Sequence, residues 1–212
     1  MRLFYSPASP YVRKVMIVAH ELGIADRIEK LPIAANPVAR DRSVRVHNPL
    51  GQVPTFITHE GMVIYDSRVI CEYLNTQAGG PFFGEGAIRW RNLTDAALGD
   101  GLLNAASLAH YEAALRPGAL RWRKWIEGHF GKISDAIGRV EMLNLGSRLD
   151  IGTITLACAI GYMDFQFSYC NWRDSHPRTA RWFRMFSERP SMRETMLQSA
   201  DGDSSMDLAA FT

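Results

Sequence analysis

The sequence predicts an α/β domain followed by an all-helical domain. Up to residue 78, short β-compatible segments alternate with segments of helical periodicity. Gly79-Gly80-Pro81 then breaks the pattern, and no convincing strand follows it. We therefore expect residues 1–78 to form the α/β domain, residues 79–86 a linker, and residues 87–212 the helical domain.

The first half of the α/β domain predicts two strands joined by a helix. Residues 2–5 are β-compatible, and residues 10–22 carry apolar side chains on one helical face, with Gly23 as a natural stop. Residues 27–31 predict a second strand, and residues 36–47 suit a short exposed helix or loop. Strand, crossover helix and strand should form a right-handed unit with parallel strands.

The second half of this domain predicts a hairpin and a helix. Residues 53–58 and 62–65 have strand character and flank Glu60-Gly61, which suits a tight turn. Asp66-Ser67 precedes a helix from residue 68 to about residue 76. The hairpin adds antiparallel strands, so we expect a mixed sheet and the element order βαβαββα.

Apolar periodicity predicts four helices in the remaining chain, over residues 87–115, 120–145, 155–169 and 177–188. Small residues recur between Ala96 and Ala106, where they would allow close contact with another helix, either in the same chain or in a second copy. Residues 199–212 are rich in aspartate and serine, and we expect them to be frayed or extended.

The composition is that of a globular protein, with 47% hydrophobic and 22% charged residues and a formal net charge of +2. The charges are spread along the chain, which argues against a nucleic-acid surface. Residues 121–125 mix cations with tryptophans, but we expect a solvated helix face there with the tryptophans buried. No run approaches the roughly 18 apolar residues of a membrane span, so we expect neither nucleic acid nor a membrane as a partner.

Cysteine and histidine usage predicts no metal site. Cys71, Cys158 and Cys170 form no CxxC pair and lie in apolar helical contexts, which favours structural burial. The six histidines form no HExxH pair. An odd number of cysteines fits a reducing cytoplasm, and the N-terminus has no long apolar segment typical of a signal peptide. We therefore expect a cytoplasmic location.

Ser9-Pro10 marks the start of the first predicted helix. Serine is a good N-cap, and proline suits the first helical position. A hydroxyl there lies among unpaired backbone N–H groups at the positive end of the helix dipole. This is a place where a protein can hold an anion such as a thiolate, although a capping role alone would also account for Ser9.

Ser9-Pro10, Gln52-Val53-Pro54 and Asp66-Ser67, taken together and at this spacing, resemble the glutathione transferase superfamily over nearly the whole chain. The likeness is greatest to bacterial and plant-like branches with Ser-Pro or Cys-Pro at the first helix. It implies a thioredoxin-like N-terminal domain and a helical C-terminal domain. One departure is the capping box of the core helix, because Thr155 is followed by Cys158 where the family has aspartate.

The resemblance implies that the N-terminal domain binds glutathione. The Val53-Pro54 bond would be cis, so that the Val53 backbone pairs with the peptide ligand as a strand would. Ser67 would bind the γ-glutamyl carboxylate at a helix start, and Asp66 the ammonium group. Gln52 would donate its amide to the glycine carboxylate.

Further candidates for that glycine carboxylate are two arginines of the loop before the hairpin, Arg40 and Arg42.

The resemblance also implies that Ser9 is the catalytic residue. Its hydroxyl would hydrogen-bond the glutathione sulfur and favour the thiolate, which is the nucleophilic form. Ser6 and Tyr5 compete for this role, and Arg13 would add positive potential or pair with an acidic neighbour. Because serine cannot form a mixed disulfide, its presence favours conjugation, addition or isomerisation over thiol–disulfide exchange.

The implied function is transfer of glutathione to a hydrophobic electrophile by a homodimeric enzyme. The electrophile pocket would involve the long helix, where Asn104, His110 and Tyr111 are candidates. Two alternatives stay open at this point. One is a glutathione-dependent isomerase or dehalogenase that uses the same site, and the other is a non-catalytic protein that binds glutathione or apolar ligands.

Overall fold

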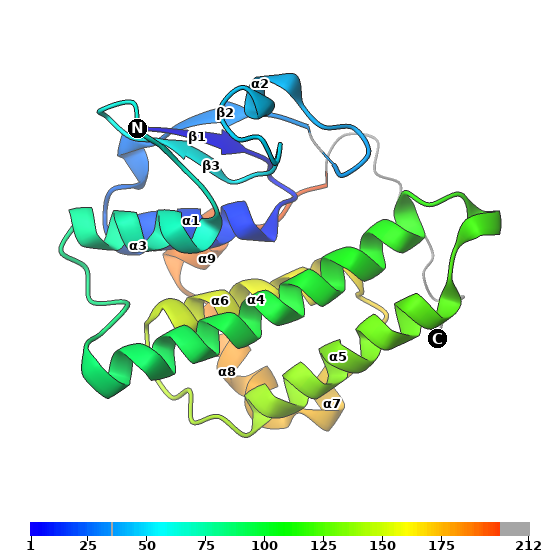
Figure 1. Ribbon diagram of the computed structural model, residues 1–212. Coiled ribbons are helices and arrows are strands. Elements are labelled where there is room, and N and C mark those ends of the chain that lie inside the picture. Colours follow the sequence, from blue (N-terminus) through cyan, green and yellow to red (C-terminus); the bar gives the residue numbers. More distant parts are fainter. Residues whose placement is uncertain (35, 200–212) are drawn as a thin grey trace. The chain divides into compact units, whose positions relative to one another are not determined.

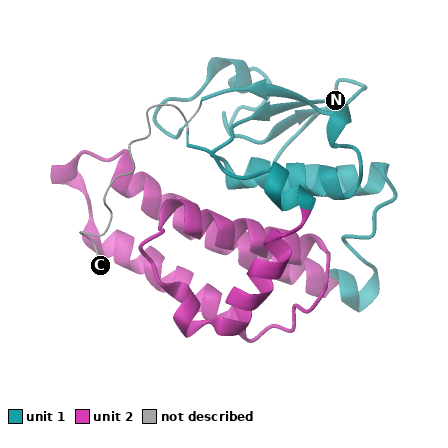
Figure 2. Ribbon diagram, turned by 180° about the vertical axis from the view of Figure 1, so that it is seen from behind, with its two compact units in different colours: residues 1–89, 190–203 teal, residues 90–189, 204–212 magenta. Residues whose placement is uncertain are grey.

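The computed structural model of the chain describes residues 1–34 and 36–199 (Figure 1). These residues fall into two compact units, coloured separately in Figure 2. The first unit contains residues 1–89 and 190–199, and the second contains residues 90–189. Residues 190–199 thus pack with the N-terminal unit, although the sequence analysis assigns them to the helical domain. The predicted linker and domain limits stay predictions, and residues 200–212, expected to be frayed or extended, lie outside the described residues.

The first unit is built on a four-stranded sheet in the order β2-β1-β3-β4. The strands are β1 (Arg2–Tyr5), β2 (Glu29–Pro32), β3 (Thr55–Ile57) and β4 (Val63–Ile64). β2 runs parallel to β1, whereas β3 is antiparallel to both β1 and β4. The mixed sheet with its hairpin is therefore confirmed. The second strand begins later than predicted, because a 3-10 turn occupies Ala25–Arg27.

Four helices belong to the described part of this unit: α1 (Pro10–Glu21), α2 (Arg42–Arg45), α3 (Ser67–Gln77) and α9 (Pro190–Glu194). Figure 1 shows α1 and α3 side by side on one face of the sheet, with α2 on the other. Successive side chains of a strand point to opposite faces of the sheet. Phe56 therefore contacts Tyr73 of α3, whereas its neighbour Ile57 packs with Phe4 and with Val44 of α2.

The second unit is helical, as predicted. Its helices are α4 (Gly86–Ala114, whose first turn counts with the first unit), α5 (Arg123–Glu141), α6 (Ile151–Gln166), α7 (Trp172–Ser175) and α8 (Pro177–Ser187). α5 begins three residues later than predicted, because Gly118–Leu120 forms a 3-10 turn. Among the described residues, no helix is both long enough and apolar enough to cross a membrane.

The start of α6 corrects the predicted capping box. Asp150, not Thr155, is the N-cap: its side chain accepts a hydrogen bond from Thr153 N at 3.0 Å, and Thr153 Oγ1 accepts one from Asp150 N at 3.0 Å. Thr155 lies inside the helix and donates its hydroxyl to Ile151 O at 2.7 Å. The box is therefore complete, with the carboxylate at the N-cap and the hydroxyl three residues later.

Part of the small-residue stretch of α4 serves packing within the chain. A Cβ atom added at Gly99 would lie 2.9 Å from the Thr155 backbone of α6. A Cβ atom added at Gly152 would lie 2.6 Å from Cβ of Asp95 on α4. The backbones of α4 and α6 therefore approach so closely that neither position has room for a side chain.

The tryptophans at the start of α5 are not buried, contrary to expectation. Trp122 is 61% exposed and Trp125 is 41% exposed, and their rings stack with centroids 6.4 Å apart. The buried face of α5 is set by Ile126 and Ile133, and a helical turn of 3.6 residues places Trp125 to one side of it. The aromatic cluster of α8, in contrast, is buried at Trp182, Phe183 and Phe186.

Candidate functional site

Sheet register brings the three sequence motifs to one edge of the first unit. Phe4 of β1 lies opposite Thr55 of β3, and Phe56 of β3 lies opposite Ile64 of β4. In an antiparallel sheet this register places the end of β1, the start of β3 and the end of β4 together. The segments that continue from these points, residues 6–9, 52–54 and 66–67, form what we call the site edge.

Ser9 caps α1 as the sequence predicts. Its Oγ accepts a hydrogen bond from Val12 N at 3.3 Å, and Pro10 occupies the first turn. The Ser9 backbone N–H donates to Ser6 O at 3.1 Å, which closes the loop after β1. Because the capping bond uses only a lone pair of Oγ, the hydroxyl proton can be donated to a further acceptor.

Tyr5, Ser6, Ser9 and Arg13 line a narrow crevice of about 10 Å³ beside the start of α1. Burial raises the pKa of the Tyr5 phenol, so this group stays protonated at neutral pH. Arg13 is buried, and its guanidinium donates to Met192 O of α9 at 3.1 Å. Arg13 thus brings a positive charge to the lining of the crevice, and its hydrogen bond to Met192 tethers α9 to α1.

The Val53-Pro54 bond is cis, as the resemblance implies. The loop before it is held by a buried polar network. Asn48 Nδ2 donates to Thr55 Oγ1 at 2.9 Å and to Gln52 O at 3.3 Å, and Thr55 Oγ1 donates to Gln52 O at 2.7 Å. Asn48 has no role in the site predicted from the sequence. The network therefore fixes the backbone of Gln52, whose side chain is exposed.

The turn before Gln52 lies against two arginines. Gly51 adopts φ +63°, and a Cβ atom there would lie 3.3 Å from Arg40 Nε and 3.1 Å from Arg45 Cγ. Arg40, one of the two predicted candidates, therefore lies beside the turn that leads into the site edge. Arg42 is the first residue of α2 and is exposed, whereas Arg45 is a neighbour of the turn that sequence reasoning missed.

Asp66 and Ser67 form the start of α3. Asp66 is the N-cap, with Oδ1 accepting from Arg68 N at 2.9 Å, and its Oδ2 accepts from the Arg68 guanidinium at 2.9 Å. Burial alone would raise the pKa of Asp66, but hydrogen bonds from Arg68 and the charges of Arg68 and Lys14 outweigh it, so the pKa is lowered. Ser67 is buried at the first helical position.

Two residues that influence this helix start are absent from the sequence-based assignment. Arg68 partners Asp66 directly, and Lys14, fully buried on α1, acts on it through its charge. An aspartate at a helix N-cap with arginine two positions later is a local pattern that could have predicted the Asp66–Arg68 pair. Nothing in the local pattern indicates that Lys14 is buried near another helix.

The remaining predicted residue, Tyr111, belongs to α4 in the second unit. Burial raises the pKa of its phenol, and its ring lies 5.7 Å from that of His110. No group of three or more metal-binding side chains occurs among the residues that the structure describes. Cys71 and Cys158 are buried and Cys170 is half-buried, all three as free thiols.

Known proteins match both the sequence and this geometry. The model of the glutathione S-transferase N-terminal domain matches residues 8–77. The uncharacterized GST-like protein YibF of Escherichia coli (strain K12) is 31% identical over 211 residues, covering 92% of this chain and 98% of YibF.

Solved structures of glutathione transferases also resemble this chain. A glutathione transferase family member from Pseudomonas fluorescens Pf-5, solved with bound glutathione, is 43% identical with a TM-score of 0.91, covering 93% of this chain and 99% of that one. A glutathione S-transferase from Methylobacterium radiotolerans JCM 2831, in complex with glutathione sulfonate, is 26% identical with a TM-score of 0.84, covering 94% and 95%. The sequence match along almost the full length of YibF and the shared fold make this chain a member of the glutathione transferase family.

Proposed function

We propose that this chain binds glutathione along the site edge and activates its thiol for transfer to a hydrophobic electrophile. The observation that carries the proposal is the strand register, which brings the Ser9, Val53-Pro54 and Asp66-Ser67 segments to one edge of the sheet. Two of the similar structures, at 43% and 26% identity, hold glutathione or glutathione sulfonate.

In this proposal, the ligand peptide pairs with the backbone of Val53, and the buried Asn48–Thr55 network keeps that backbone in place. The γ-glutamyl carboxylate binds at the start of α3, where the Ser67 hydroxyl and the positive end of the helix dipole favour an anion. Asp66 supplies the negative charge for the ammonium group, which would share the carboxylate with Arg68.

At the other end of the ligand, Gln52 donates its side-chain amide to the glycine carboxylate. Arg40, beside the preceding turn, adds a positive charge, and Arg42 is a second source of one. The crevice near Ser9 has room for little more than a water molecule, so the tripeptide would lie across the site edge and not inside the crevice.

Ser9 is the residue that activates the glutathione thiol. A free thiol with a pKa near ~8.5 is mostly protonated at neutral pH. The Ser9 hydroxyl proton, directed at the sulfur at the positive end of α1, stabilises the thiolate over the thiol. The thiolate then attacks the electrophile, and Ser9 itself does not ionise. Tyr5 and Ser6 line the same crevice and remain the alternative donors.

The test is turnover of glutathione with a generic aryl halide. We expect Ser9→Ala to lower kcat/KM by about 10²-fold, the usual cost of removing a positioned donor, with little change in glutathione affinity. Tyr5→Phe and Ser6→Ala are matched controls that remove one hydroxyl each from the same crevice. If Ser9→Ala turns over normally and one of these variants does not, the role passes to that residue.

The reaction class is tested separately from binding. Saturable glutathione binding with no turnover of aryl halides would identify either an isomerase or dehalogenase, which substrate profiling would reveal, or a binding protein. Participation of Tyr111 in the electrophile pocket and a homodimer remain predictions from the resemblance. The cytoplasmic location remains a prediction from cysteine usage. Sedimentation in solution would distinguish dimer from monomer.

A further inference from the structure

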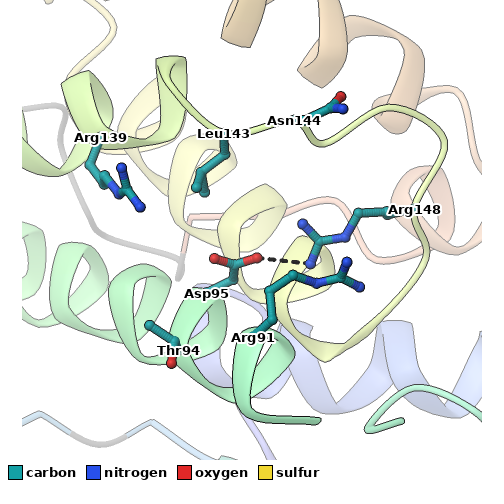
Figure 3. A pocket seen from close by; sticks show the side chains of 7 residues that line it. All are labelled: Arg91, Thr94, Asp95, Arg139, Leu143, Asn144 and Arg148. Carbon is teal, nitrogen blue, oxygen red and sulfur yellow. Dashed lines mark hydrogen bonds and ion pairs between the residues drawn. The ribbon is translucent and has the colours of Figure 1, made fainter. Parts of the chain in front are cut away.

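A hollow of about 390 Å³ lies in the second unit, and none of its lining residues belongs to the site edge. It lies between α4, the last turn of α5 and the segment that joins α5 to α6 (Figure 3). Its lining combines three arginines with one carboxylate, one hydroxyl, one amide and one apolar side chain. We call it the arginine hollow, after Arg91, Arg139 and Arg148.

Arg148 is held rigidly on one side of the hollow. Its Nη2 donates to Asp95 Oδ2 at 2.8 Å and its Nε to Asp150 Oδ2 at 2.9 Å, and the side chain is only 19% exposed. A guanidinium clamped by two carboxylates loses little further freedom when it binds a ligand. Arg148 is therefore preorganised.

The other two arginines are not neutralised by acidic partners. Arg91 donates to Asn92 Oδ1 at 3.2 Å, which is a neutral amide. Arg139 is exposed, and its guanidinium has no hydrogen-bond or ion-pair partner within residues 1–34 and 36–199. In Figure 3 the Arg148 guanidinium points at Asp95, the Arg91 guanidinium lies on the same side as that of Arg148, and the Arg139 side chain lies on the opposite side of Asp95. Three positive groups face the two carboxylates of Asp95 and Asp150, so the cluster carries one net positive charge.

The size and lining of the hollow indicate the class of ligand. Its volume exceeds what a bare ion needs and falls within the range of small-molecule pockets. Guanidinium groups match the oxygens of phosphoryl groups in charge and in geometry. Leu143 and the hydrocarbon stems of the arginines offer an apolar surface to the remainder of the ligand.

We propose that the arginine hollow binds a small phosphate monoester, with Arg91 and Arg139 contacting the phosphoryl group and Arg148 orienting it. The proposal does not depend on glutathione binding, because the predicted glutathione residues all belong to the first unit.

The experiment is calorimetric titration of the full chain with phenyl phosphate and with inorganic phosphate, at an ionic strength held constant with chloride. We expect saturable binding of one phenyl phosphate per chain, tighter than that of inorganic phosphate. Arg139→Gln and Arg91→Gln should each weaken the binding by at least about tenfold, because each removes a charge-assisted hydrogen bond. Both residues are exposed, so these variants should fold.

Two controls make the outcome decisive. Arg184→Gln removes the same charge from an exposed position on α8, outside the hollow, and should leave the affinity unchanged. Ser67→Ala alters the predicted glutathione site and should also leave phenyl phosphate binding unchanged. Absence of saturable binding would overturn the proposal, as would equal weakening in Arg184→Gln or loss of binding in Ser67→Ala.

Discussion

The site edge and the arginine hollow are built by different means. At the site edge, short stretches of chain supply backbone groups, caps and hydroxyls at the ends of strands and helices. In the arginine hollow, an ion pair joins Asp95 and Arg148, which lie 53 residues apart, in partly buried surroundings. The difference suggests that the site edge can change with little loss of stability, whereas the hollow is part of what stabilises the second unit.

The largest loss of stability is expected when Arg148 of the arginine hollow is replaced. Replacing Arg148 by methionine leaves the carboxylates of Asp95 and Asp150 buried without their cation, which should cost about 3–5 kcal/mol in the free energy of unfolding. All five tryptophans lie in the second unit, so denaturant unfolding followed by tryptophan fluorescence reports on it. Arg184→Met, at an exposed site, should cost less than about 0.5 kcal/mol. A loss below about 1 kcal/mol in Arg148→Met would mean that the network does not stabilise the unit.

A pair of glycines on α4 tests the close approach of α4 and α6. Gly99→Ala places a Cβ atom 2.9 Å from the Thr155 backbone and should destabilise by about 1–3 kcal/mol. Gly101→Ala meets no atom within 4 Å and should stabilise by about 0.5–1 kcal/mol through the better helix propensity of alanine. Tryptophan fluorescence again reports both. Changes of the same sign would contradict the packing described here.

At the site edge, Asn48→Ala removes the donor to Thr55 and Gln52 from a fully buried position. We expect glutathione affinity to fall by about tenfold, or ~1.4 kcal/mol, because the backbone beside the ligand loses its support. Asn36→Ala is the matched control, since Asn36 caps an exposed turn through Val38 N at 2.9 Å. Equal affinities in the two variants, measured by calorimetry, would show that the network has no part in binding.

The smallest effect is expected at Glu141, which caps α8 by accepting from Thr179 N at 2.8 Å and Arg178 N at 2.9 Å. Burial alone would raise the pKa of Glu141, but the hydrogen bond from the Thr179 hydroxyl and these two backbone hydrogen bonds outweigh it and lower the pKa below the ordinary value of 4.5. A lowered pKa stabilises the fold above pH 4.5, and that stabilisation is lost as the pH falls through the folded-state value.

Glu141→Gln should therefore cost about 1 kcal/mol near neutral pH, and the difference from wild type should shrink below about pH 4.5. Unfolding curves at several pH values, read by tryptophan fluorescence, would show this. A difference that stays constant with pH would mean that the charge of Glu141 does not contribute.

Local sequence patterns were sufficient to predict most helices and strands of the first unit. Ser9 and Pro10 occupy the first turn of α1 because capping depends on a few adjacent residues, and the register of the hairpin follows from alternation around its turn. The family resemblance implied the cis bond before Pro54. The support from Asn48 could not be predicted, because it depends on which polar groups are buried together.

In the second unit, the helices follow from their apolar periodicity, but their starts and polar contacts do not. The predicted cap at Thr155 was wrong because Asp150, five residues earlier, caps the helix, and buried residues extend it upstream to Ile151. Trp125 was expected inside, yet only tertiary packing decides which side of an aromatic-rich helix faces the core. The Asp95–Arg148 pair joins distant segments, and neither residue lies in a recognisable motif.

In the proposed function, the site edge binds glutathione, and Ser9 lowers the pKa of the bound thiol. The most direct measurement is a pH titration of the thiolate ultraviolet absorbance of glutathione bound to wild type and to Ser9→Ala. The account predicts a thiol pKa well below that of free glutathione in wild type, and a return toward the free value in Ser9→Ala with binding retained. A bound thiol that titrates like free glutathione in the wild-type protein would contradict it.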